Sequence, residues 1–285
     1  MATIRADMAI IGGSSTFSLA FPEDTGREVQ ILEKNFTVST PYGESPPFKL
    51  FSYAGRTILT VKMHGWRQGV SRADASRQIF WVFREAGVKE VLAEGGVGSI
   101  NHLLRPRDLM VVNDYMDYSM RKDVGLDSGY LLIMRHAFCP RLRQALLHAA
   151  EKVPGRRVFD RGVYVCTDGR HFESPAEVAS YRILGGDVVG QSAVPEVYLA
   201  REIGACYARI DMVVNYGEGV VKEWEHEELK DIFYNEAGTI ANLLLEAVTI
   251  LPTVTGHCEC AQLRKPTLLR EEKEEKEGEQ WERTE

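Results

Sequence analysis

Short apolar runs alternate along this chain with amphipathic stretches of helical spacing. The apolar runs predict strands and the amphipathic stretches predict helices. We expect strands over 6–13, 88–99, 108–118, 161–169, 187–192 and 208–219, a hairpin over 48–63, and helices over 71–87, 140–153, 174–186, 194–204 and 228–251. This alternation is typical of an α/β layer fold with a mostly parallel sheet. Continuous patterning without an internal linker predicts one domain over 1–262.

Helix-end signals sharpen two of these boundaries. Ser174 and Glu177 have the spacing of a capping box, and Pro175 suits the first turn of the same helix. Gly87 suits the C-terminal cap of the preceding predicted helix, 71–87. The 263–285 segment lacks such signals, and we expect an acidic tail that is a frayed helix or disordered.

Charge narrows the possible functions. The 285 residues carry a net charge of −7, and residues 271–285 alone hold eight Glu against three Lys or Arg. The rest of the chain is therefore close to neutral at −2, which disfavours a general nucleic-acid binder. No apolar run approaches the roughly 18–20 residues that span a bilayer, and no signal peptide opens the chain. We expect a cytoplasmic protein without membrane association.

Five cysteines fit a reducing compartment. Cys139, Cys166 and Cys206 lie in apolar or helical stretches, where they are expected to be buried thiols. Cys258 and Cys260 form a Cys-Glu-Cys motif, which is tight for a disulfide and too small for a four-ligand zinc site without further partners. We therefore predict a surface redox pair or inert thiols here, and no metal.

Glycine- or serine-bearing turns follow most of the predicted strands. They are 12–15, 64–67, 94–99, 168–174, 190–192 and 215–219. In α/β folds, ligands bind beyond the carboxyl ends of the strands, so these turns can converge on one pocket. Backbone amides of such turns suit anions. The first turn, GGSS, is neither a P-loop nor a dinucleotide fingerprint.

Four longer motifs carry a resemblance. They are IIGGSS at 10–15, GVKEVLAEGGVGSINHLLRPRDLMVVNDYMDYSMR at 87–121, RGVYVCTDGRHFESPAE at 161–177 and GGDVVGQSAVPEVYLARE at 185–202. In this order they resemble the trimeric purine nucleoside phosphorylase and methylthioadenosine phosphorylase family. The resemblance implies a large central mixed sheet flanked by helices, and a homotrimer or hexamer. It also implies cleavage of a purine nucleoside by inorganic phosphate, which gives free base and sugar 1-phosphate with no other cofactor.

The resemblance also assigns site residues. It implies phosphate-binding roles for Ser14, His64 and Ser192, a ribose-facing position for Gln191, and a base pocket of Phe172, Glu173, Asn215 and Gly217. An amide at 215 can donate to a purine O6 and accept from N7–H, whereas 6-aminopurine enzymes carry Asp there. Asn215 therefore favours 6-oxopurine substrates, namely inosine, guanosine or 5′-methylthioinosine.

The phosphate segment departs from the family pattern. Met63 stands where the family has a phosphate-binding Arg, Trp66 and Gln68 replace a second Arg and a His, and Glu94-Gly95 replaces a Thr or Asn in the glycine turn. We expect Arg67, or else Arg72 or Arg77, to supply the missing charge.

Two other interpretations stay open. One is a phosphate-independent nucleosidase with Glu94 as general base, and the other is a non-catalytic oligomer that binds a nucleoside or base.

Overall fold

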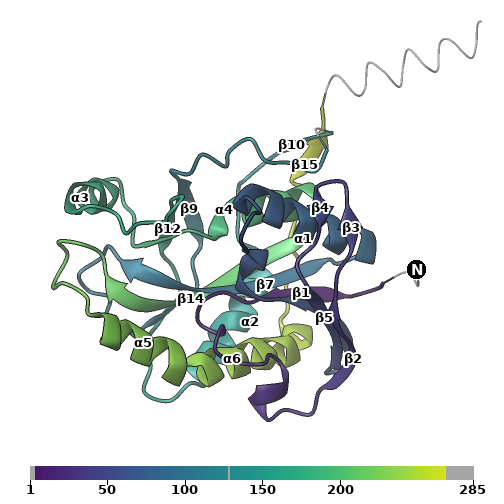
Figure 1. The fold of residues 1–285 in the computed structure, drawn as a ribbon, viewed down its shortest axis with the longest axis horizontal. Coiled ribbons are helices and arrows are strands. Elements are labelled where there is room, and N and C mark those ends of the chain that lie inside the picture. Colours follow the sequence, from purple (N-terminus) through teal and green to yellow (C-terminus); the bar gives the residue numbers. More distant parts are fainter. Residues whose placement is uncertain (1–3, 128, 268–285) are drawn as a thin grey trace, which may run out of the picture.

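A computed structural model describes residues 4–127 and 129–267 of the chain, which fold around a large central sheet (Figure 1). The strands of its main path are, in spatial order, β11 (Val158–Phe159), β8 (Leu109–Met110), β14 (Cys206–Tyr216), β7 (Glu90–Ser99), β1 (Met8–Ile11), β6 (Arg56–Val61), β5 (Phe48–Tyr53) and β2 (Gln30–Phe36). Three further strands, β9 (Asp114–Asp117), β12 (Val163–Cys166) and β13 (Val188–Gly190), branch from β7. The central pairs are parallel, whereas β5–β6, β2–β5 and β13–β7 are antiparallel, so the sheet is mixed.

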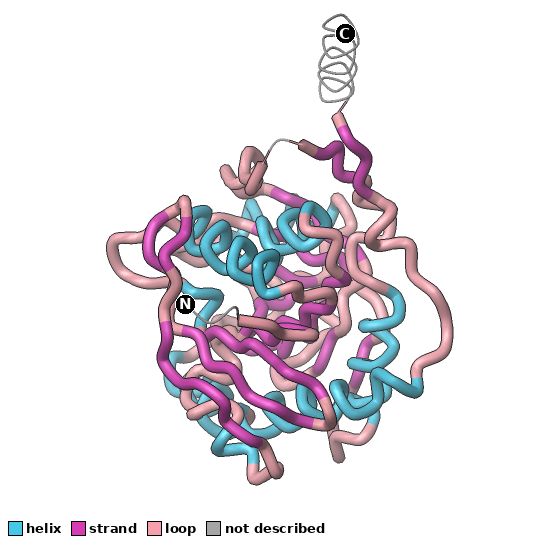
Figure 2. The backbone as a smooth tube through the Cα atoms, turned by 90° about the vertical axis from the view of Figure 1, so that its right-hand side faces the viewer, coloured by secondary structure: helices cyan, strands magenta, loops and turns pink. Residues whose placement is uncertain are grey.

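Helices cover both faces of this sheet (Figures 1 and 2). α1 (Arg72–Ala86) and α4 (Ala193–Glu202) pack on one face, and α2 (Pro140–Glu151), α5 (His226–Asn235) and α6 (Ala237–Ile250) pack on the other. β1 shows why both faces need cover. Its residues Ala9 and Ile11 join the first apolar cluster, and Met8 and Ile10 join the second, because successive side chains of a strand point to opposite faces.

The capping signals are present in the structure. The Ser174 side chain accepts a hydrogen bond from the Glu177 amide, and the Glu177 carboxylate accepts one from the Ser174 amide. This box fixes the start of α3 (Pro175–Ile183), whose N-cap Ser174 directly follows Glu173. Gly87 ends α1 in the left-handed region at φ 84°.

Two predicted elements differ from the observed ones, and the observed strand β2 has no predicted counterpart. The expected strand over 108–118 is two short strands, β8 and β9, which pair with different neighbours. The expected helix over 228–251 is α5 and α6, which meet at Glu236, where the carboxylate binds Arg107 and Arg156. α5 is amphipathic and α6 is mostly buried, so the two helices meet the sheet differently. The polar edge strand β2 lacks the apolar pattern that predicts a strand.

The C-terminal boundary also moves. β15 (Arg264–Pro266) pairs antiparallel with β10 (Tyr130–Leu132), so the predicted tail begins later than residue 263. Residues 268–285, which hold most of that tail, lie outside the described residues. The remaining short elements are β3 (Ser39–Thr40), β4 (Gly43–Glu44) and three 3-10 turns, η1 (Glu23–Thr25), η2 (Met63–Gly65) and η3 (Leu251–Thr253). Over the described residues, no helix combines the length and the apolar character needed to cross a bilayer.

Candidate active site

A cavity of about 240 Å³ lies at the carboxyl ends of β7, β13 and β14 and beside the loops that follow β1 and β6. This is the edge at which α/β sheets bind ligands. The structure brings eight of the nine predicted site residues to its wall. They are Ser14, His64, Phe172, Glu173, Gln191, Ser192, Asn215 and Gly217. Arg67 is not among the residues that line it.

The loop after β1 closes around a buried carboxylate. Glu94 accepts hydrogen bonds from the amides of Gly13, Ser15 and Thr16 and from the Thr16 hydroxyl, the last at 2.7 Å. Gly13 allows this close approach, because a Cβ there would lie 2.3 Å from the Glu94 carbonyl oxygen. Ser14 instead binds the Gly96 amide through its hydroxyl oxygen at 3.0 Å. The amides of this glycine turn are therefore engaged by a side chain of the protein itself.

Beside the cavity lies a guanidinium that the sequence analysis did not single out. Arg209 is fully buried in β14 and donates from Nη2 to the Ser192 hydroxyl oxygen at 3.0 Å. Gly95 makes room for it, because a Cβ at that position would lie 2.6 Å from Arg209 Nη2. A positive group thus approaches Ser192 from β14.

Arg209 is held in a fixed orientation. Its Nε and Nη2 bind the Asp211 carboxylate, with the shortest contact at 2.5 Å, and its guanidinium lies 4.6 Å from the centre of the Tyr164 ring. Burial works against the charged form, but Asp211, Tyr164 and Tyr207 together outweigh it and raise the pKa of Arg209 well above its ordinary value. Nη1 is buried without a hydrogen-bond partner among the described residues.

The sequence did carry a signal for this pair. Arg209 and Asp211 are two residues apart in an otherwise apolar strand, and such residues point to the same face. Opposite charges with this spacing indicate a buried ion pair, because an isolated buried charge is strongly unfavourable.

His64 is anchored between three elements. It sits in η2 at φ 53°, is 3% exposed, and its Nδ1 lies 2.7 Å from Glu196 Oε1 in α4. The hydroxyl of Tyr207 in β14 donates to the other oxygen of Glu196 at 2.7 Å. Burial would raise the pKa of Glu196, but His64 and Arg209 outweigh it and lower that pKa. The Glu196 carboxylate thus fixes the orientation of the His64 ring through its contact with Nδ1.

The structure corrects the expectation for Arg67. Its guanidinium donates to the backbone oxygens of Gly65 and Glu44 and to Gln78, which hold it outside the cavity wall. Arg77 turns toward Asp74 and the backbone of Gly125. Several nearby hydrogen-bond acceptors hold each of these two guanidinium groups.

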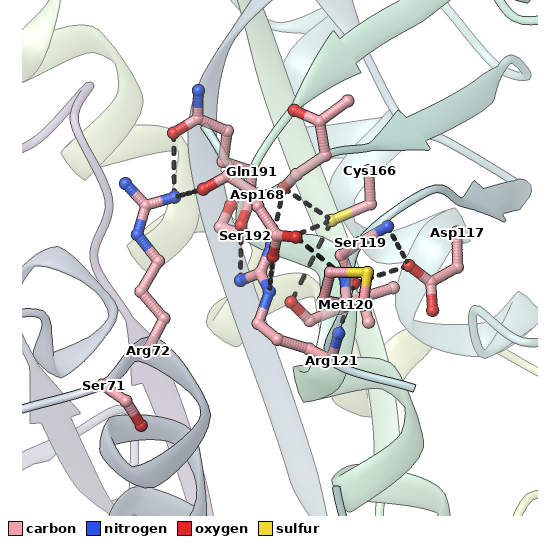
Figure 3. A network of polar contacts seen from close by, with 12 residues as sticks. Ser71, Arg72, Asp117, Ser119, Met120, Arg121, Cys166, Asp168, Gln191 and Ser192 are labelled. Carbon is pink, nitrogen blue, oxygen red and sulfur yellow. Dashed lines mark hydrogen bonds and ion pairs between the residues drawn. The ribbon is translucent and has the colours of Figure 1, made fainter. Parts of the chain in front are cut away.

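Arg72 reaches the rim of the cavity. It stacks 3.9 Å over the Trp66 ring. It also donates to the Asp168 carbonyl and to Gln191 Oε1, the last at 2.9 Å (Figure 3). Trp66 and Gln191 both line the cavity. Arg72 therefore organises the rim through these two side chains.

The opposite end of the cavity combines aromatic and amide groups. The Phe172 ring packs 4.8 Å from the Trp224 ring, and Glu173 accepts from the Thr167 hydroxyl at 2.6 Å. Asn215 donates one amide hydrogen to the Tyr216 carbonyl at 2.8 Å. Within the described part of the chain, no donor binds its Oδ1. One N–H and one oxygen of Asn215 are thus free to pair with a ligand.

Comparison with known proteins identifies the family. The model of the phosphorylase superfamily matches residues 8–249. A probable 6-oxopurine nucleoside phosphorylase of Moorella thermoacetica is 34% identical over 261 residues, which cover 89% of this chain and 96% of that protein. The 6-oxopurine nucleoside phosphorylase of Pyrococcus furiosus is 32% identical over 86% of this chain and 93% of its own length. A probable S-methyl-5′-thioinosine phosphorylase of Methanothermobacter thermautotrophicus is 31% identical over 89% and 87%.

Solved structures agree on the fold. A methylthioadenosine phosphorylase from an antarctic soil metagenomic library superposes with a TM-score of 0.77 over 91% of each chain, at 22% identity. The methylthioadenosine phosphorylase of Schistosoma mansoni in complex with adenine superposes with a TM-score of 0.75 over 91% of this chain and 95% of its own, at 23% identity. With a family model that spans most of the chain and relatives above 30% identity, the protein belongs to the phosphorylase superfamily.

Proposed function

We propose that this protein is a purine nucleoside phosphorylase that cleaves the N-glycosidic bond of 6-oxopurine nucleosides with inorganic phosphate. The substrates would be inosine, guanosine or 5′-methylthioinosine, and the products free base and sugar 1-phosphate. The observation that carries the proposal is the convergence of eight residues, implied by the family resemblance, on one cavity wall. The relatives above 30% identity, which are named for this chemistry, support it.

At one end of the cavity, hydroxyl groups and a positive charge suit phosphate. Ser14, Ser192 and His64 all line the cavity. Arg209 donates to Ser192, which orients the Ser192 hydroxyl hydrogen toward a bound anion and brings a positive charge behind it. A phosphate held here beneath the sugar can attack C1′ without the entropic cost of a bimolecular encounter.

At the other end, Asn215 suits the departing base. As the glycosidic bond breaks, negative charge moves onto the purine ring. The free N–H of Asn215 can donate to O6, and its Oδ1 can accept from N7–H. Phe172 offers an aromatic face to the base, and Glu173 offers an acceptor for a ring N–H.

One observation favours a second candidate, a phosphate-independent nucleosidase. The Glu94 carboxylate occupies the amides of residues 13, 15 and 16, which an external anion would otherwise use. Both of its oxygens accept hydrogen bonds, so Glu94 is poorly suited to be the base that activates water in that alternative. A hydrolytic reaction would therefore need another base.

We further propose that the active unit is a homotrimer or hexamer. Met120 is 89% exposed, and its amide binds the Asp168 carboxylate at 2.8 Å, next to the rim at Arg72 and Gln191 (Figure 3). An apolar side chain this exposed beside a cavity suits a surface that a neighbouring subunit covers.

The test is release of base from inosine, guanosine, adenosine and their 5′-methylthio forms, with and without phosphate. Phosphate-dependent release from the 6-oxopurine nucleosides is the expected result. Release at the same rate without phosphate would replace the proposal with the nucleosidase, and base binding by calorimetry without any release would replace it with the non-catalytic binder.

A further inference from the structure

Four of the five cysteines meet at the opposite end of β14 from the cavity. The sulfur atoms of Cys139, Cys206, Cys258 and Cys260 all lie within 4.8 Å of one another, and none is in a disulfide. Cys139, Cys206 and Cys260 are buried, and Cys258 is half-buried. The Cys-Glu-Cys motif therefore has the two partners that its sequence lacks.

The fold sets this arrangement with backbone hydrogen bonds. The Cys139 amide donates to the Tyr207 carbonyl at 2.7 Å, and the Cys206 amide donates to the Lys89 carbonyl at 2.8 Å. Arg201 donates from its guanidinium to the Cys260 carbonyl at 3.3 Å, which ties the C-terminal segment to α4. Three segments that are distant in sequence thus present their thiols to one point.

We propose that these four thiols bind one structural zinc ion. Zinc prefers four thiolates in a tetrahedron with Zn–S bonds near ~2.3 Å, which places the sulfur atoms at separations of the order seen here. On binding, the four S–H groups lose their protons to solvent and each sulfur donates an electron pair to the ion. No oxidant is needed.

The surroundings suit the negative charge of a zinc tetrathiolate. Cys139 is the N-cap of α2, and the positive end of a helix stabilises a thiolate. Arg201 lies against the Cys260 backbone, and Arg141, which is paired with Glu90, follows in the first turn of α2. The helix end and Arg201 offset part of the two negative charges that the complex would carry.

All four zinc positions are filled by protein sulfur, so the site is closed and takes no part in the reaction. Cys206 begins β14, and Asn215 lies nine residues further along it, which is roughly 30 Å in an extended strand. The ion instead cross-links the start of β14, the start of α2 and the C-terminal segment. It stabilises the sheet end that carries none of the cavity.

The test is the metal content of the full chain, purified with a thiol reductant and without chelator. We expect about one zinc ion per chain by inductively coupled plasma mass spectrometry. Cobalt added in place of zinc is expected to give the visible absorption of a tetrahedral thiolate complex. Cys258→Ser, at the half-buried position, is expected to lose most of the metal and to lower the unfolding temperature. Cys166→Ala, at the fifth cysteine, is expected to keep it.

Two results would overturn the proposal. One is a folded wild-type chain that, even after incubation with zinc, contains no metal and still has five free thiols by titration. The other is a metal-free chain with disulfides among these four residues under the same reducing conditions. If Cys258→Ser fails to fold, Cys139→Ser provides a second test, because it removes a different ligand.

Discussion

Individual side chains decide what the cavity can bind. Asn215 has one N–H and one oxygen available, and Ser192 is backed by a guanidinium. At the position before His64, where the family resemblance implies an arginine, the chain has Met63. In the proposed function, the positive charge comes instead from Arg209, two residues before Asp211 in β14. We therefore place the charge of the anion end on the sheet side and an amide at the base end.

Asn215→Asp tests the assignment of the base end. An ionised carboxylate would repel a 6-oxopurine O6, whereas a protonated one could donate to N7 beside a 6-amino group. We expect kcat/KM for inosine to fall by at least about tenfold, or about 1.4 kcal/mol, relative to adenosine. Steady-state kinetics with both nucleosides measure the ratio. An unchanged ratio of kcat/KM for inosine to kcat/KM for adenosine in a folded variant would show that Asn215 does not face the base. Asn215→Ala should lower kcat/KM for both nucleosides.

Arg209 can be tested without leaving a buried charge alone. Arg209→Met by itself should cost about 3–5 kcal/mol of unfolding free energy, because Asp211 loses its partner. The double variant Arg209→Met, Asp211→Leu removes both charges, and we expect it to fold and to raise the KM for phosphate at least about tenfold. Arg77→Met, whose guanidinium points away from the cavity, is the matched control. A double variant with the phosphate KM of the wild type would rule out the role of Arg209.

At the scale of secondary structure, the site depends on contacts between elements. η2, α4 and β14 meet at the carboxylate of Glu196, which binds His64 and Tyr207. The N-cap of α3, Ser174, directly follows Glu173, and the capping box fixes that boundary. The apolar and polar pattern predicts the central strands, the helices on both faces and this cap, because each is set by neighbours close in the sequence.

Other features depend on contacts that the pattern does not carry. The break between α5 and α6 follows from Arg107 and Arg156, which reach Glu236 from distant segments. Arg209 lies in a strand whose apolar neighbours indicate core, so only its spacing from Asp211 marks it. The four cysteines are likewise separated by up to 121 positions, from Cys139 to Cys260, and only the topology brings them together.

Glu196 also makes a prediction for pH. Its pKa in the folded protein is lowered from 4.5, so its contribution to stability is present above about pH 4.5 and is lost as the pH falls through the folded-state value. We expect the unfolding free energy of the wild type to fall more steeply on acidification than that of Glu196→Gln, as measured by urea unfolding at several pH values. Glu227→Gln, an 81% exposed helix residue, should follow the wild type. If the unfolding free energy falls with pH equally steeply in all three proteins, the role of Glu196 is contradicted.

At the scale of the whole molecule, the cavity, the family and the expected assembly bear on the same reaction. The chain has the fold of nucleoside phosphorylases, and its relatives above 30% identity are named for 6-oxopurine or methylthioinosine phosphorolysis. Tyr118 and Met120 are exposed apolar side chains, and the Met120 amide binds Asp168, whose carbonyl accepts from Arg72. A subunit that covers them would also exclude water from the sugar, which favours transfer to phosphate over hydrolysis.

Met120→Glu tests this assembly. A charge in a covered apolar contact is costly, so we expect the trimer or hexamer to dissociate and the KM for the nucleoside to rise several-fold. Light scattering coupled to size exclusion gives the mass, and the kinetics are measured on the same samples. Leu103→Glu, at another exposed apolar residue, serves as the control. A wild type that is monomeric at working concentration and fully active would contradict the proposed assembly.

The measurement that tests the central claim most directly is the fate of the sugar. Inosine is cleaved in ¹⁸O-labelled water that contains inorganic phosphate, and the sugar product is analysed by mass and by phosphorus NMR before it can exchange. The account predicts ribose 1-phosphate in a one-to-one ratio with hypoxanthine and no ¹⁸O at C1′. Free ribose labelled at C1′ would mean that water is the nucleophile, and the protein would then be a nucleosidase on a phosphorylase fold.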